Sequence, residues 1–116
     1  MAELQLHLTC DHEVFGDGSG SIERCMIRPA ERMMELCEKH GTRLTFFFDV
    51  CEYWAFREVQ ERNGFENGER PADRLEEHLK DIVRRGHDVQ LHFHPQWLRA
   101  EYSGGGEWRL DHSLWR

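Results

Sequence analysis

The sequence has no excess of positive charge and no long apolar run. Its 116 residues carry 15 lysine and arginine side chains against 22 aspartate and glutamate side chains, for a net charge of −7. Nucleic-acid binders and polybasic membrane anchors need cationic surface, so we expect neither nucleic acid nor membrane as a partner. No stretch approaches the roughly 18 apolar residues of a membrane span. The opening MAELQLHLTC does not have the pattern of a signal peptide.

Closely spaced cysteine pairs are also missing. The four cysteines lie 12 to 15 residues apart, at Cys10, Cys25, Cys37 and Cys51. This spacing indicates neither a zinc ribbon nor a disulfide framework, and we expect reduced cysteines in a cytoplasmic protein. Hydrophobic residues make up 39% and charged residues 32% of the chain, which is typical of a globular protein. The length predicts a single domain over residues 1–116.

Three segments have the pattern of strands and three that of helices. LQLHLT (4–9) and HDVQLHFHP (87–95) alternate apolar and polar residues, and RLTFFFDV (43–50) is a nearly continuous apolar run. Helices are expected at 29–40, 51–62 and 71–86. The first of these is followed by Gly41 and the last ends at Gly86, the residue type that most often ends a helix.

The alternation of strands and helices predicts an α/β fold, a parallel sheet with flanking helices. Three parallel strands leave an open edge. We therefore expect the first part of a larger, distorted (β/α) barrel. Residues 98–116 show little periodicity and are expected to form a poorly structured tail.

Polar side chains gather where the three strands end. The first strand runs into CDHE (10–13), the second ends at Asp49, and the third contains His92 and His94. The carboxyl ends of parallel strands meet at one edge of a sheet, where functional groups are usually found. Asp49 is expected to cap the helix that begins at Cys51.

The period of two in a strand decides which of these side chains can meet. Asp11 and Glu13 share the polar face of the first strand, whereas His12 points the other way. His92 and His94 share a face, with Cα atoms about 6.6 Å apart. Both imidazoles can therefore bind one ion at about 2.0–2.1 Å.

Two imidazoles and one carboxylate form a common catalytic metal set, and a hydrolase also needs a carboxylate that accepts a proton from water. The sequence predicts Glu13, His92 and His94 as ligands of a divalent metal, zinc by preference, and Asp11 as the base. His12 remains an alternative to Glu13 as third ligand. His92 and His94 could also be ordinary hydrogen-bonded residues of a sheet.

The motifs LHLTCDHE, RLTFFFDV and DIVRRGHDVQLHFHPQW resemble the N-terminal part of the polysaccharide deacetylase (carbohydrate esterase) family. The resemblance implies a metal-dependent hydrolase that removes acyl groups from a carbohydrate substrate, with Asp11 as base, Glu13 as ligand and His92 as first metal histidine. Gln96 stands where the second histidine of the family usually lies, so His94 must substitute. The later motifs of the family, including a histidine general acid, are not found up to Arg116.

Two other interpretations stay open. His-x-His at a strand end also occurs in amidohydrolase-type metal hydrolases, where it usually belongs to the first strand rather than the third. Alternatively, the chain is a non-catalytic, degenerate domain that binds a partner, including a second copy of itself through the open sheet edge.

Overall fold

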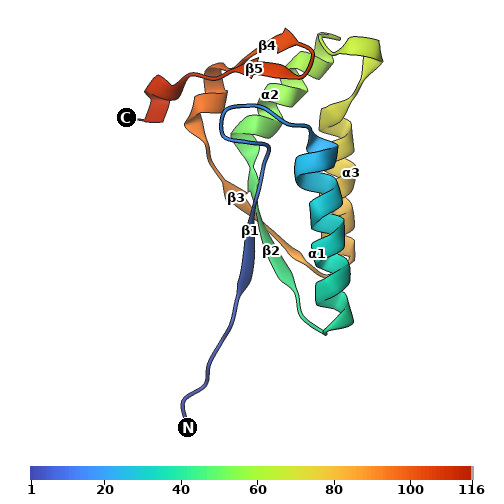
Figure 1. Ribbon diagram of the computed structural model, residues 1–116, viewed down its shortest axis with the longest axis vertical. Coiled ribbons are helices and arrows are strands. Elements are labelled where there is room, and N and C mark those ends of the chain that lie inside the picture. The colour runs from blue at the N-terminus through green and yellow to red at the C-terminus, as the bar shows by residue number, and fades with distance from the viewer. Residues whose placement is uncertain (116) are drawn as a thin grey trace.

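The computed structural model describes residues 1–115, without the side chain of Trp115, and Arg116 lies outside the described residues. Its centre is a parallel sheet in the order β1-β2-β3, formed by Leu8–His12, Leu44–Asp49 and Asp88–His92 (Figure 1). The predicted α/β class, with a parallel sheet flanked by helices, is confirmed. Among the described residues this sheet is open and closes no barrel.

The helices lie close to their predicted positions. A π-helical turn, Glu23–Ile27, leads into α1 (Arg28–Lys39), and α2 (Val50–Glu61) and α3 (Pro71–Arg84) follow β2. Gly41 and Gly86 follow α1 and α3 with φ values of 66° and 86°, the left-handed conformation that a side chain disfavours. Each helix therefore ends where the sequence indicates.

The two faces of the sheet differ in what covers them. Phe46 of β2 pairs in register with Cys10 of β1 and Val89 of β3, and this face is covered by α1 and α3, which run along the same side of the sheet in Figure 1. By the same register, Asp11 and His92 lie on the opposite face. In the part of the chain that the structure describes, no helix lies on that face (Figure 1). The largest fully buried apolar side chains are Met26, Ile27, Met34, Phe46, Leu75 and Ile82.

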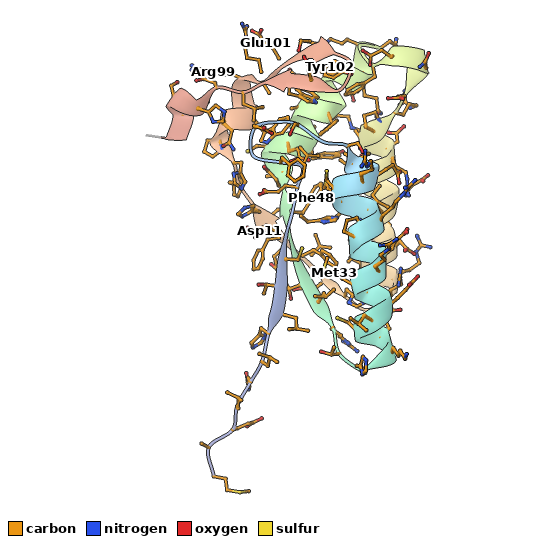
Figure 2. The ribbon with its side chains drawn as sticks, viewed as in Figure 1. Asp11, Met33, Phe48, Arg99, Glu101 and Tyr102 are labelled. Carbon is orange, nitrogen blue, oxygen red and sulfur yellow. The ribbon has the colours of Figure 1, made fainter. Side chains whose placement is uncertain are left out.

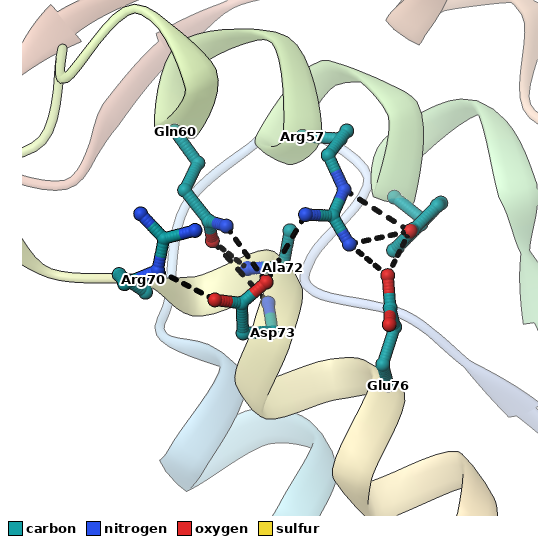
Figure 3. Close-up of polar contacts among 7 residues, drawn as sticks. Arg57, Gln60, Arg70, Ala72, Asp73 and Glu76 are labelled. Atoms are coloured by element: carbon teal, nitrogen blue, oxygen red, sulfur yellow. Dashed lines mark hydrogen bonds and ion pairs between the residues drawn. The ribbon is translucent and has the colours of Figure 1, made fainter.

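A polar network joins α2 to the start of α3 (Figure 3). Oε1 of Gln60 accepts hydrogen bonds from the main-chain nitrogens of Ala72 and Asp73 at 2.8 and 3.2 Å. Its amide nitrogen donates to Oδ1 of Asp73 at 2.9 Å, and Arg57 donates to the same oxygen at 3.0 Å. Gln60 thus satisfies main-chain donors that the first turn of a helix leaves without partners.

Residues 98–115 differ from the poorly structured tail expected over 98–116, of which Arg116 lies outside the described residues. A 3₁₀ turn (Pro95–Arg99) is followed by an antiparallel hairpin of β4 (Glu101–Gly104) and β5 (Glu107–Arg109), and by a second 3₁₀ turn, His112–Trp115. The ring of Trp108 lies 5.1 Å from that of Phe56, and the ring of Tyr102 lies 4.8 Å from that of Phe65. These aromatic contacts with residues far away in the sequence order the hairpin.

The first strand also begins later than its sequence pattern predicts. Leu4 and Leu6 are 94% and 82% exposed. The reason lies in the neighbouring strand, because β2 begins at Leu44, which pairs with Leu8. Residues 4–7 therefore extend past the sheet (Figure 1). In residues 1–115, no helix is both long enough and apolar enough to cross a membrane.

Candidate metal centre

The carboxyl ends of β1 and β3 bring Glu13, His92 and His94 together. Nε2 of His94 lies 2.9 Å from Oε2 of Glu13 and 2.7 Å from Nε2 of His92. The remaining side of this triangle, from Nε2 of His92 to Oε2 of Glu13, is 3.6 Å. Three of the four site residues predicted from the sequence thus converge on one point.

The spacing of the three donor atoms fits a metal ion. Tetrahedral zinc with bonds of about 2.0–2.1 Å places neighbouring donor atoms about 3.3 Å apart. The observed separations of 2.7, 2.9 and 3.6 Å lie around that value. Oε2 of Glu13 is buried and accepts no hydrogen bond of good geometry among the described residues. A buried carboxylate oxygen without such a bond is unfavourable, and a cation at this point would compensate it.

Asp11, the predicted base, stands at the open side of the cluster. Its Oδ2 lies 3.9 Å from Nε2 of His92, and its side chain is 64% exposed. Figure 2 shows Asp11 on the side of the sheet away from α1, with Phe48 on the side toward it. Asp11 is therefore next to the three donor atoms without being one of them.

His12, the alternative third ligand, lies on the opposite face of the sheet. It is buried, and its Nε2 is 2.9 Å from Nε2 of His78 on α3. Burial, together with the neighbouring His78, lowers the pKa of His12 to about 3. His12 is directed away from His92 and His94, as its position in the strand predicts.

Asp49 caps α2, as the sequence predicts, and also contacts the site. Its Oδ1 accepts hydrogen bonds from the main-chain nitrogens of Cys51 and Glu52 at 3.0 and 3.3 Å. The same oxygen is 3.4 Å from the main-chain nitrogen of His94. Burial raises the pKa of Asp49. One carboxylate thus links the start of α2 to the segment that carries the second histidine.

The sequence reasoning missed Glu52, a buried acid in the first turn of α2. Both of its oxygens face the main-chain nitrogen of Val14, at 3.1 and 3.3 Å. This contact holds the chain immediately after Glu13. Burial and the nearby Asp49 raise the pKa of Glu52 well above its usual value. Its position three residues after Asp49 is that of a capping-box acid, which is the one signal that could have drawn attention to it.

Gln96 is a second buried residue, to which the sequence reasoning assigned no role in the site. Its side-chain nitrogen lies 3.2 Å from Nδ1 of His94, on the ring edge that faces away from Glu13. Gln96 lies in the 3₁₀ turn Pro95–Arg99, where the main-chain nitrogen of Asp111 donates to its carbonyl oxygen at 3.0 Å. The folded end of the chain therefore supports this side of the site.

The electrostatics of the centre favour a positive ion. Burial raises the pKa of Glu13, and the histidines beside it act in the opposite direction. Asp49 and Asp11 add further negative charge nearby and raise the pKa of Glu13 again. A bound cation would stabilise the ionised carboxylates that now repel one another.

Comparisons of the chain with protein-family models, with curated proteins and with solved structures found no match. The resemblance to polysaccharide deacetylases therefore rests on the sequence motifs quoted above. The fold and the site define an open α/β sheet with a cluster of one glutamate and two histidines at the carboxyl ends of its strands.

Proposed function

We propose that the protein is a metal-dependent hydrolase that removes acyl groups from carbohydrates. The observation that carries this proposal is the convergence of Glu13, His92 and His94, with the carboxylate of Asp11 beside them. The motifs that resemble polysaccharide deacetylases supply the substrate class. We also propose that the sheet is part of a distorted (β/α) barrel. This is supported by the same resemblance, by the parallel strands and by the polar, uncovered face of the sheet.

In this proposal Glu13, His92 and His94 hold a divalent metal, for which zinc suits the donor set best. Such an ion, when bound, makes a water molecule more acidic and polarises the acyl carbonyl. Asp11 accepts the proton of the attacking water, a role that suits a carboxylate close to the ligands but not among them. Its exposure leaves room for a substrate on the open face. The four cysteines are free thiols, which supports a cytoplasmic location.

Hydrolysis of an activated ester tests the proposal at its simplest point. An aryl acetate has a leaving group that needs no general acid, so it isolates the roles of the metal ligands and of Asp11. We expect zinc-dependent hydrolysis, lowered about 10²–10⁴-fold by Asp11→Asn with zinc affinity unchanged. Acetylated amino-sugar oligomers then test the substrate class. Equal rates for the wild type and the Asp11→Asn variant would contradict the assignment of the base.

A second candidate function, self-association without catalysis, rests on a different observation. On β3, which forms an edge of the sheet, Leu91 and the following Phe93 are 67% and 62% exposed. The N-terminal residues offer a matching strand, because Leu4 and Leu6 alternate with polar residues and extend past the sheet. A second copy that adds its N-terminal segment to this edge would cover both sets of side chains.

Sedimentation over a range of protein concentrations tests this second candidate. If the N-terminal segment pairs with β3 of another copy, the wild type is dimeric or larger at high concentration. A Leu4→Asn, Leu6→Asn variant is then monomeric, and a Leu36→Asn control, which changes an exposed leucine of α1, associates as the wild type does. A wild type that remains monomeric at all concentrations overturns the candidate.

A further inference from the structure

Gln96 contacts His94 at the atom that decides how His94 can bind a metal. The Gln96 side chain is only 1% exposed, and its amide nitrogen lies 3.2 Å from Nδ1 of His94. The other ring nitrogen, Nε2, is the one that faces Glu13 and His92. A neutral imidazole carries a single proton, on Nδ1 or on Nε2.

The orientation of the Gln96 amide therefore controls the donor atom of His94. An amide nitrogen that donates to Nδ1 requires the ring proton to be on Nε2, where it blocks coordination. An amide oxygen that accepts from Nδ1–H leaves the lone pair of Nε2 directed into the site. The two orientations have nearly the same shape, so hydrogen bonding determines which one is adopted.

The first orientation leaves a buried acceptor of Gln96 without a partner. Oε1 of Gln96 is buried and has no hydrogen-bond partner among the described residues. Rotation of the amide by 180° brings this oxygen to Nδ1 of His94, where it accepts a hydrogen bond. The amide nitrogen then takes the former place of the oxygen. Because Oε1 can accept only from a protonated Nδ1, the rotated amide and the metal-binding form of His94 favour each other.

We propose that Gln96 is a positioning residue for the metal site. Its Oε1 accepts a hydrogen bond from Nδ1–H of His94, and this bond directs Nε2 toward Glu13 and His92. Histidine ligands commonly have a partner of this kind on their second nitrogen. The inference rests on the proposed metal site. Gln96 stands at the position where the polysaccharide deacetylases that the motifs resemble usually have a histidine ligand. Here Gln96 orients a ligand instead of being one.

The backbone of Gln96 is fixed well enough for this role. Its carbonyl oxygen accepts a hydrogen bond from the main-chain nitrogen of Asp111 at 3.0 Å. The neighbouring Trp97 is buried and its ring lies 5.3 Å from that of Trp108 of the hairpin. The side chain of Gln96 is thus held against His94 by contacts of its own carbonyl group and of the residue that follows it.

Zinc affinity of Gln96 variants, measured by competition with a chromophoric chelator, tests the proposal. Gln96→Met has a similar size but cannot accept a hydrogen bond, and we expect its zinc Kd to be about 10–100-fold weaker. Gln96→Glu keeps an acceptor and should bind zinc within a few-fold of the wild type. Gln60→Met is the matched control, because Gln60 is equally buried but serves α3. It should lower the melting temperature and leave the zinc Kd unchanged.

A spectroscopic measurement on the wild type keeps the proposal testable if a variant fails to fold. Nitrogen-15 NMR of the zinc-loaded chain should show a proton on Nδ1 of His94 that exchanges slowly with solvent. Rapid exchange of this proton in the wild type, or zinc binding by Gln96→Met as tight as that of the wild type, overturns the role of Gln96 alone. Equally weak binding by the Met and Glu variants overturns it too. A wild type that does not bind zinc overturns both this inference and the proposed metal site.

Discussion

Glu52 on α2 holds the chain beside the candidate metal centre, because its Oε2 accepts a hydrogen bond from the main-chain nitrogen of Val14 at 3.1 Å. Val14 follows Glu13 directly, so the helix that continues from the carboxyl end of β2 determines where this ligand lies. The acid is buried, and burial together with Asp49 raises its pKa well above the usual value. The position of Glu13 and the ionisation of Glu52 are therefore linked.

Glu52→Gln should stabilise the protein at pH 7 relative to the wild type. The pKa of Glu52 is raised in the folded state, so the unfolded state ionises first as the pH increases. The native state therefore loses stability above the pKa that Glu52 has in the unfolded state. The amide keeps the acceptor for Val14 and removes this loss. At pH 4, where Glu52 is protonated in the native state, the difference should largely disappear. Urea unfolding at both pH values measures it.

Glu52→Ala serves as the contrasting variant. It leaves the buried main-chain N–H of Val14 without an acceptor, which should lower the free energy of unfolding by about 1–3 kcal/mol. If the alanine and glutamine variants have the same stability at pH 7, the hydrogen bond to Val14 does not contribute to the fold.

The buried pair His12 and His78 should make the protein sensitive to mild acid. Burial lowers the pKa of His78 to about 4, so the unfolded chain takes up a proton at pH 5 while the native state does not. The stability that is present above pH 6.5 is therefore lost progressively as the pH falls toward 4. For His78 this amounts to about 2 kcal/mol between pH 7 and pH 5.

The variant His78→Gln removes this contribution, together with the part of the pKa lowering of His12 that His78 causes. Its free energy of unfolding should fall by about 2 kcal/mol less than that of the wild type between pH 7 and pH 5. An identical loss in both proteins would show that His78 is already protonated in the native state at pH 5.

The hairpin of β4 and β5 should resist proteolysis as long as Trp108 is present. The Trp108 ring packs against Phe56 and Trp97, with centroid distances of 5.1 and 5.3 Å. Trp108→Ala removes these contacts, and limited trypsin digestion should then cut at Arg99 and Arg109 much earlier than in the wild type. An Arg99→Gln, Arg109→Gln variant controls for the identity of the cleavage sites. Rapid cleavage of the wild type at these arginines would contradict the packed hairpin.

The sequence pattern was sufficient to predict those helices and strands that depend mainly on their own residues. The apolar spacing of α3, with Pro71 at its start and Gly86 after its end, places the helix almost to the residue. The period of two also separates His12 from Glu13 correctly, because β1 keeps its extended conformation up to the end of the strand. Local periodicity thus predicts which side chains share a face.

Features that depend on contacts between distant residues could not be predicted in this way. The hairpin is ordered by aromatic residues of α2 and of the loop after it, such as Phe56 and Phe65. The strand pattern of residues 4–7 finds no partner because β2 begins at Leu44. Gln96 is a polar residue whose burial depends on the turn that follows β3. No local pattern contains these relationships.

Zinc binding tests the central claim most directly. The measurement pairs zinc content, determined by mass spectrometry, with unfolding curves in EDTA and in added zinc. We expect one zinc per chain and a stabilisation of about 2.7 kcal/mol at a zinc concentration one hundred times the Kd. The His92→Ala, His94→Ala variant should unfold as the wild type does in EDTA and gain nothing from zinc. A folded wild type that contains no metal and is not stabilised by zinc would contradict the account, and Glu13, His92 and His94 would then be a polar cluster of the sheet.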